Sequence, residues 1–390
     1  MASGKDDIID KLMKETKEEL ADEQPEFRIH WPKRNLKRVF NIAFPFLNIS
    51  LAVLVIWIGM NQGEVTLYDI RGVNINWWWV VAGMGLYYLM VANESVRLGI
   101  VMKKMTGHRK LGLSTKMYVL ERFYSLLTPL SSGGRPYQIY YLHKHGYKFT
   151  DSSSTVFSHY IIGRIGFQIA SGLCIVLLFH QLGNLDGGGI VTSAIIFGIV
   201  FNVGVTIVTL FLVFNRAITE KVANIGICIL YKLHLIKHKK NSINHTRDMI
   251  WQFRQNVRRV MRDKVTTATA VLMAVFSYTT YISIIMFVYA SLWGWSWSVA
   301  PILLLGIALT EYISSFVPLP GGTGGMEFFF LSVFASVFGS PQILVALVLW
   351  RIITFMLPIV NGLPIILFDS FKFNMKKTSM PESETIQHSE

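Results

Sequence analysis

A short pattern of charged residues around a glycine pair occurs twice along this chain. Each copy contains, in order, a glutamate, a proline, a glycine pair and an arginine, in or beside apolar sequence and at nearly the same spacing. The residues are Glu121, Pro129, Gly133, Gly134 and Arg164 in the first copy and Glu311, Pro318, Gly321, Gly322 and Arg351 in the second. Hydrophobic segments interrupted by Gly and Pro at corresponding positions of two halves are the best sequence indication of a transporter's binding site. We therefore expect a membrane translocase.

Composition agrees with a membrane-embedded chain. Hydrophobic residues make up 52% and charged residues 16% of the sequence, whereas roughly 25% of the residues in soluble domains are charged. A helix needs about 20 mostly apolar residues to cross the hydrocarbon core. The runs that approach or exceed this length are 44–61, 77–101, 155–182, 190–214, 265–293 and 342–368. We predict an all-α polytopic integral membrane protein.

Two further apolar segments, 117–142 and 298–338, are interrupted by the clusters of Pro and Gly. We predict that each forms a re-entrant or discontinuous helical hairpin. Non-helical backbone at membrane depth is tolerated only where protein or a water-filled cavity covers it. The interruptions therefore indicate either a cavity or a tightly packed seam between helices.

The basic residues indicate the orientation of the chain. Of the 37 Lys and Arg residues, only Arg71 falls in a segment that we expect outside. Because Lys and Arg are enriched in cytoplasmic loops, both termini are expected in the cytoplasm. The segments that flank the first glycine pair then lie on the cytoplasmic side, and those that flank the second lie on the outer side. The two copies are therefore predicted to form an inverted-topology repeat.

We expect one membrane domain with polar ends. The predicted parts are a cytoplasmic polar segment 1–38, a transmembrane lipid-translocase domain 39–370 with a basic cytoplasmic linker 236–264, and a disordered cytoplasmic tail 371–390. The linker has the pattern of an amphipathic helix. Its apolar face is Ile250, Phe253, Val257 and Val260, opposite Arg247, Arg254, Arg258, Arg259 and Arg262. Such a helix is attracted to anionic lipid headgroups by about 1 kcal/mol per basic residue. Alternatively, the linker is a soluble run of basic residues whose only role is to fix the membrane topology.

Charged residues inside the predicted spans are the first candidates for a substrate-binding site. They are Arg164, Glu311, Glu327 and Arg351 near the middle of the bilayer, and Glu121 with Arg122 nearer the cytoplasmic face. Each such charge costs about 2.5–3.5 kcal/mol at the bilayer centre, so these residues usually pair or line a pathway. In one interpretation the arginines chelate a phosphate, while the glutamates hold a cationic headgroup or release the arginines. In the other, buried ion pairs only fix the helix register.

The glycines add possible backbone donors to the same site. The second copy continues from Gly321 and Gly322 to Gly324 and Gly325, and the following residues 326–338 are predicted to form a short helix. The N–H groups and dipole at a helix N-terminus suit an anionic headgroup. The first copy offers Gly133, Gly134 and Arg135 in the corresponding place. Alternatively, the glycines only permit a tight hairpin and close helix packing.

Enzymatic and cofactor functions find little support in the sequence. His143, His145 and Asp151 show no recognisable metal-ligand spacing. The glycine cluster at 321–325 lacks the Gly-Lys-Ser/Thr ending of a nucleotide loop. His159 precedes Arg164 on the same predicted helix and is interpreted as a helix-packing histidine. We expect no cofactor, no metal and no nucleic-acid partner.

The two interrupted segments resemble the signatures of a known family. Pro129-Leu-Ser-Ser-Gly-Gly-Arg-Pro-Tyr and Pro318-Leu-Pro-Gly-Gly-Thr-Gly-Gly-Met-Glu are similar to the two motifs of the lysyl-phosphatidylglycerol synthase transmembrane family. The resemblance covers roughly residues 40–370. In the bacterial multiple peptide resistance factor, a domain of this type flips aminoacylated phosphatidylglycerol to the outer leaflet. The resemblance thus implies a lipid flippase of a bacterial plasma membrane, with a role in resistance to antimicrobial peptides.

The chain ends soon after the last predicted span, where the resistance factor continues into its aminoacyltransferase domain. We therefore expect a translocase and no lysyltransferase activity. The expected substrate is an anionic or aminoacylated phospholipid such as lysyl-phosphatidylglycerol. Two alternatives stay open: a flippase for a glycolipid or a polyprenyl-phosphate-linked sugar, and a non-transporting scaffold that recruits an envelope enzyme. A homo-oligomer or an envelope-enzyme partner is compatible with each of them.

Overall fold

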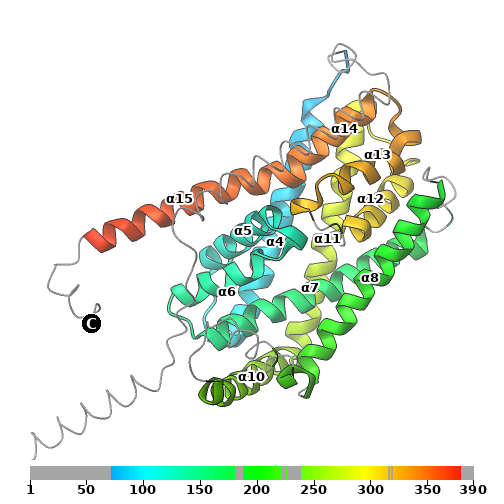
Figure 1. Ribbon diagram of the computed structural model, residues 1–390. Coiled ribbons are helices and arrows are strands. Elements are labelled where there is room, and N and C mark those ends of the chain that lie inside the picture. Colours follow the sequence, from blue (N-terminus) through cyan, green and yellow to red (C-terminus); the bar gives the residue numbers. More distant parts are fainter. Residues whose placement is uncertain are drawn as a thin grey trace, which may run out of the picture. The chain divides into compact units, whose positions relative to one another are not determined.

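The computed structural model describes residues 72–178, 180, 188–215, 217–221, 225, 239–314, 317 and 319–378. Over these residues the secondary structure is helical, without a strand (Figure 1). The elements are α4 (Trp77–Thr106), α5 (Leu111–Leu127), η1 (Pro129–Ser131), α6 (Gly134–Lys144), α7 (Phe149–Leu177), α8 (Gly188–Phe214), α10 (Lys239–Arg262), α11 (Lys264–Trp293), α12 (Ala300–Ser314), η3 (Pro320–Gly322), α13 (Gly325–Phe338), α14 (Gln342–Arg351), η4 (Ile352–Met356) and α15 (Leu357–Thr378). The predicted all-α class is confirmed.

The chain divides into two units. One consists of residues 1–38 and 215–251, and the other of residues 39–214 and 252–390. Apart from the first part of α10, all the helices named above belong to the second unit.

Within the described residues, four helices are long and apolar enough to cross a membrane: Phe149–Leu177, Thr192–Phe214, Lys264–Trp293 and Gln342–Asp369. The spans predicted at 190–214, 265–293 and 342–368 are thus confirmed as apolar helices. The span predicted at 77–101 lies within α4, which has 30 residues and carries Glu94 and Arg97 inside that span and Lys103 and Lys104 in its last turn. The span predicted at 44–61 lies outside the described residues.

The helix α7 begins earlier than the sequence suggested. The span was predicted at 155–182, but the helix starts at Phe149 and ends at Leu177. Its first turns are rich in Ser, and the hydroxyls of Ser152 and Ser154 donate to the carbonyl oxygens of Lys148 and Thr150, at 2.9 and 2.7 Å. These bonds satisfy the hydroxyls inside the helix, so the polar start does not end it.

Helix α4 packs mainly against α11, α5 and α7, and α7 also packs against α11. Close approach depends on small residues: a Cβ atom added to Gly166 of α7 would lie 2.4 Å from the Cβ atom of Ala274 in α11. Such contacts are typical of helices packed in membranes. On α8, large apolar side chains such as Phe197, Val200 and Phe211 are more than half exposed, as expected of a surface that faces lipid.

The two interrupted segments both form helix–break–helix hairpins. The first is α5–η1–α6 and the second is α12–η3–α13, with the two arms of each hairpin in contact. The breaks η1 and η3 contact one another, and η3 also contacts α5. Each break contains two consecutive residues with positive φ: Leu130 and Ser131 in η1, and Gly321 and Gly322 in η3. The repeated motif therefore brings its two interruptions together, and the membrane side from which each hairpin enters stays a prediction.

The predicted amphipathic helix of the basic linker is α10. Its apolar face packs on the helices of its own chain: Val257 lies in a core with Ile161 and Val213, and Val260 in one with Val101 and Ile162. Arg254 was placed on the opposite, exposed face, and this was wrong. Its side chain is buried, and Nη2 donates to the carbonyl oxygen of Phe214 at the end of α8 (2.6 Å).

The last helix extends the membrane domain at its C-terminal end. A π-helical turn, η4, joins α14 to α15, and α15 continues to Thr378. The segment predicted as a disordered tail from residue 371 is therefore helical up to Thr378, and residues 379–390 lie outside the described part. Asp369 of α15 accepts a hydrogen bond from the hydroxyl of Tyr141 (2.6 Å) and pairs with Lys116 (3.2 Å), which ties α15 to both arms of the first hairpin.

Candidate functional site

The arginine of the second repeat copy is held by an ion pair. Arg351 ends α14, and its Nη2 lies 2.5 Å from Oε1 of Glu327, whose side chain is only 1% exposed. Glu327 is the third residue of α13, and its Oε2 accepts a hydrogen bond from the N–H of Gly324 (2.6 Å). This hydrogen bond, one arm of a capping box, holds the carboxylate at the helix N-terminus. Two of the predicted intramembrane charges therefore neutralise each other.

Arg351 also connects this pair to the second break. Its Nη1 approaches the carbonyl oxygen of Gly321 at 3.5 Å, and the guanidinium lies 5.4 Å from the ring centroid of Phe355. The π-helical turn η4 begins immediately after Arg351. Such turns are frequent at functional sites, and this one places Arg351 and Phe355 on the same side as the break.

Glu311 and the pair Glu121–Arg122 are arranged differently from the prediction. Glu311 accepts a hydrogen bond from the hydroxyl of Tyr281 (2.7 Å) and lies within electrostatic range of Arg122 and Arg351 without an ion pair to either. Glu121 accepts from the hydroxyl of Ser125 (3.0 Å). Both Glu121 and Arg122 are described, and no ion pair joins them. Glu311 therefore keeps a carboxylate that no arginine of the described chain neutralises directly.

The arginine of the first copy has no acidic partner. Arg164 sits midway along α7 and donates from Nε and Nη2 to the hydroxyl of Thr206 (3.2 and 3.0 Å) and from Nη2 to the side chain and carbonyl oxygen of Asn202 (2.7 and 2.9 Å). Gln168 bonds to the same two residues of α8 (2.9 and 3.2 Å). Within the described residues, no carboxylate lies within ion-pair distance of Arg164. This half-buried cation is thus held in place by neutral groups alone.

A second cation lies close to Arg164. Arg135 is the second residue of α6, immediately after the first glycine pair, and its guanidinium stacks 3.9 Å from the ring centroid of Tyr160 on α7. Arg135 is within electrostatic range of Arg164, and the described chain gives it no ion pair either. Two arginines that repel each other, with Tyr160 beside them, form an arrangement that an anion would stabilise.

The glycines of both motifs are closely packed. A Cβ atom on Gly134 would lie 2.5 Å from the carbonyl oxygen of Glu121, and one on Gly133 would lie 2.5 Å from Thr128. The N–H of Gly133 already donates to the hydroxyl of Thr128 (2.8 Å). In the second copy, a Cβ on Gly325 would lie 2.6 Å from Val317. The glycines thus allow the arms of each hairpin to meet.

Further glycines of the second break adopt conformations that require glycine. Gly321, Gly322 and Gly324 have φ values of 61°, 64° and 87°. The N–H of Gly322 donates to the carbonyl oxygen of Leu319 (3.0 Å), and that of Gly324 to Glu327. These two amides are therefore already bonded within the protein, which leaves the arginine side chains as the stronger candidates for anion binding.

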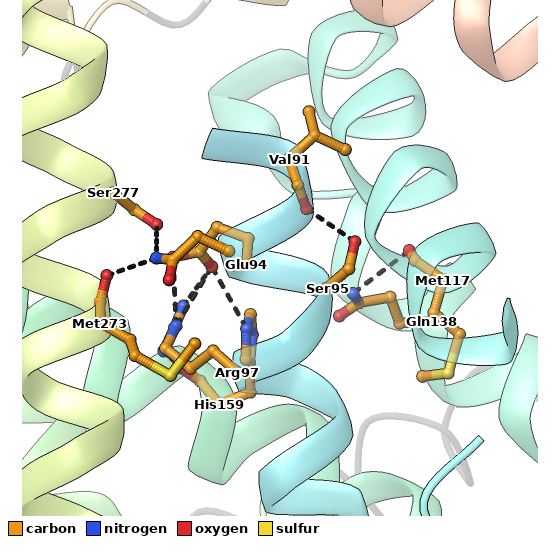
Figure 2. Close-up of polar contacts among 10 residues, drawn as sticks. Val91, Glu94, Ser95, Arg97, Met117, Gln138, His159, Met273 and Ser277 are labelled. Atoms are coloured by element: carbon orange, nitrogen blue, oxygen red, sulfur yellow. Dashed lines mark hydrogen bonds and ion pairs between the residues drawn. The ribbon is translucent and has the colours of Figure 1, made fainter. Parts of the chain in front are cut away.

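The structure reveals a buried charged cluster that the sequence interpretation did not identify. Glu94 and Arg97 of α4 and His159 of α7 meet with 6%, 3% and 7% of their surfaces exposed (Figure 2). Arg97 and Glu94 both fall inside the predicted span 77–101, which α4 contains. Glu94 is an acid inside a predicted span, and that signal was available in the sequence.

The fold and these sites define an all-α, multi-pass membrane protein built around two interrupted helical hairpins. The chain belongs to the family described as the lysylphosphatidylglycerol synthase transmembrane region, whose family model matches residues 42–362. No curated protein and no solved structure matches the chain.

Proposed function

We propose that the protein is a lipid translocase that moves a phospholipid with a phosphate-containing headgroup, anionic or aminoacylated, between the two leaflets. The observation that carries this proposal is the pair of arginines without acidic partners, Arg164 and Arg135, beside the first break. An arginine presents its donors in a planar fork that suits phosphate oxygens. The membership in a family of membrane-embedded lipid synthase regions supports a lipid ligand.

In this proposal the phosphate of the headgroup binds between Arg135 and Arg164, while the acyl chains stay in the bilayer. The hydroxyl of Thr206 and the amide oxygen of Asn202 accept from Arg164 and hold its guanidinium in one orientation without neutralising it, and the amide of Gln168 donates to these same two groups. A preorganised cation loses little entropy when it binds its ligand. The phosphate then supplies the negative charge that the described surroundings of Arg164 lack.

We propose that the Arg351–Glu327 pair of the second half is structural and that Glu311 of the same half binds a cationic headgroup. Arg351 is neutralised by Glu327, so it is a weaker phosphate ligand than Arg164. Glu311 is hydrogen-bonded to Tyr281 but not ion-paired, and it is the carboxylate best suited to an amino group such as that of a lysyl headgroup. A polyprenyl-phosphate-linked sugar shares the phosphate chemistry but would leave Glu311 without a cation.

We further propose that the chain acts as a transporter and not as a lysyltransferase. It would lie in a bacterial plasma membrane with both termini in the cytoplasm, as the distribution of basic residues suggests. The scaffold alternative differs in one respect. A scaffold would not require Arg164, whereas a translocase would.

The test is a leaflet assay in proteoliposomes that contain the purified protein and a trace of lysyl-phosphatidylglycerol. A membrane-impermeant amine reagent reports the fraction of this lipid in the outer leaflet over time. The native protein is expected to expose the inner-leaflet pool, Arg164→Gln to lose this activity, and Arg259→Gln, which removes an exposed arginine of α10, to keep it. Native protein that behaves like empty liposomes, with this lipid and with plain labelled phosphatidylglycerol, would contradict the proposal.

A further inference from the structure

Glu94, Arg97 and His159 form a buried cluster with one unsatisfied position. The guanidinium of Arg97 binds the carboxylate of Glu94 through Nε (3.1 and 3.2 Å) and Nη2 (2.5 Å), which neutralises both charges. Nη1 of Arg97 donates to the carbonyl oxygen of His159 (2.9 Å). The His159 ring places Nε2 only 3.3 Å from Oε2 of Glu94, yet Nε2 has no hydrogen-bond partner within the described residues. Figure 2 shows Glu94 between the two basic side chains.

This arrangement suits one additional proton. With the imidazole neutral, the carboxylate of Glu94 balances Arg97, and an N–H on Nε2 would point at a carboxylate oxygen that already carries negative charge. Protonation of His159 adds a second cation beside Glu94, and protonation of Glu94 instead releases Arg97 from its counter-charge. Either change alters the charge of a site whose residues are more than nine-tenths buried, where electrostatic interactions are strong.

The other charged and titratable groups near the cluster come from α5. Tyr118, itself buried, lies within electrostatic range of Glu94, and Glu121 lies within range of His159. From α11 the neighbouring groups are neutral: Asn93 of α4 donates to the carbonyl oxygen of Met273 (2.7 Å) and to the hydroxyl of Ser277 (2.6 Å). The carboxyls of Glu94 and Glu121 thus offset the cation that a protonated His159 would add beside Arg97.

The cluster is mechanically linked to the proposed lipid site. His159 and Arg164 belong to the same helix, α7. The side chain of Arg97 contacts the backbone of α7 between these two residues. A Cβ atom on Gly163 would lie 3.1 Å from Nη2 of Arg97, so the guanidinium is in close contact with α7 there. The Glu94–Arg97 pair is therefore in direct contact with the part of α7 that leads to Arg164.

We propose that Glu94 and His159 together form a proton-binding site that couples proton movement to lipid transport. In each cycle one proton from the water on one side would form an N–H bond on His159 or an O–H bond on Glu94. The same proton would leave to water on the other side, so that atoms and charge balance. The proton site stands on the geometry of the cluster, and its coupling to transport rests on the proposed function.

The coupling is tested by imposing a pH gradient across the proteoliposomes. One pH unit corresponds to a tenfold ratio of proton activities, so strict one-proton coupling shifts the steady-state leaflet ratio of the lipid by about tenfold per unit. We expect this shift for native protein and for His143→Asn, an exposed-histidine control on α6. Glu94→Gln and His159→Asn are expected to give a ratio that ignores the gradient, while Glu94→Asp, which keeps the carboxylate, retains a response. Native transport that ignores the gradient would overturn the coupling and leave the translocase proposal standing.

Proton binding is tested separately, without transport, by nitrogen NMR of 15N-histidine-labelled protein in detergent. One imidazole signal, absent from His159→Asn, should titrate within the pH range over which the protein stays folded and shift its midpoint in Glu94→Gln. If no lipid crosses the membrane in any assay, the translocase proposal fails, whereas this titration still decides the proton site. A His159 signal that does not change over this range would overturn the site.

Discussion

The two copies of the motif place an arginine at corresponding positions, but they surround it differently. Arg351 is bound to the buried carboxylate of Glu327, whereas Arg164 is held by the neutral side chains of Asn202 and Thr206. A neutralised pair fixes the contact between α13 and α14 and leaves little attraction for an anion. A cation held by neutral groups keeps its attraction. We therefore propose that the repeated motif forms a structural lock in one half and the ligand site in the other.

The largest expected effect is a loss of stability when one partner of the Arg351–Glu327 ion pair is removed. Arg351→Gln leaves the Glu327 carboxylate buried without its counter-ion, and removing one partner of a buried pair costs about 3–5 kcal/mol. The double variant Arg351→Gln/Glu327→Gln should recover most of this loss, because no charge stays buried. Unfolding of the purified proteins in detergent, followed by circular dichroism, measures the difference. A single variant as stable as the native protein would show that Arg351 does not serve as a lock.

The next largest effect is expected when Arg164 is given an acidic partner, as Arg351 already has one. Asn202→Asp places a carboxylate where the amide oxygen now accepts from Nη2 of Arg164 at 2.7 Å. A hydrogen bond between charged groups is worth about 1.5–3 kcal/mol, so the affinity for a phosphate headgroup should fall by about tenfold or more. Equilibrium binding of fluorescent phosphatidylglycerol measures this, with Asn202→Gln as the uncharged control. Equal losses in the two variants would mean that shape rather than charge is responsible.

Removing the arginine of the first half should cost less stability than removing that of the second. Arg164→Gln loses hydrogen bonds between a charged guanidinium and neutral groups, each worth about 1.5–3 kcal/mol, but it also removes a costly intramembrane charge, which offsets part of this loss. We expect a small change in the unfolding midpoint together with loss of lipid transport. A destabilisation as large as that of Arg351→Gln would place Arg164 among the structural residues.

The smallest effect lies outside both halves and provides a baseline. Asp263 caps α11, accepting from the N–H of Thr266 (3.1 Å), and pairs with Lys104. The hydrogen bond from Lys104, followed by those from Thr266, lowers the pKa of Asp263 to about 2. Because the folded-state pKa is below the usual value of about 3.9, its contribution is present above that value and is lost as the pH falls toward 2. The unfolding midpoint of Asp263→Asn should therefore change less between pH 5 and pH 3 than that of the native protein; an equal change would contradict this assignment.

Much of the fold could be predicted because its signals are local. Apolar runs identify α8, α11 and α14–α15, and the Pro/Gly clusters identify the two hairpin breaks. Charges inside apolar sequence suggested buried ion pairs without indicating which residues pair, and Arg351 with Glu327 forms one such pair. The positions of helix ends were less certain. Serines at the start of α7 satisfy their hydroxyls within the helix, so polarity there did not mark its beginning.

The surroundings of the individual charges were not predictable in the same way. Asn202 and Thr206 carry no charge and give no signal in an apolar helix, although they determine the state of Arg164. Glu94 and Arg97 both lie in the predicted span 77–101, but nothing in the sequence showed that they meet His159 of another helix. Arg254 illustrates a third difficulty: helical periodicity places a side chain on a face, but the neighbouring end of α8 determines whether that face is buried.

The most direct test of the difference between the two halves is lipid binding by neutralised variants. Fluorescent phosphatidylglycerol is titrated into native protein, Arg164→Gln and the double variant Arg351→Gln/Glu327→Gln, each confirmed as folded by circular dichroism. We expect the double variant to bind within a few-fold of the native affinity and Arg164→Gln to lose at least about tenfold, or 1.4 kcal/mol. Native affinity in Arg164→Gln, with loss of binding in the double variant, would contradict the account and move the phosphate site to the second half.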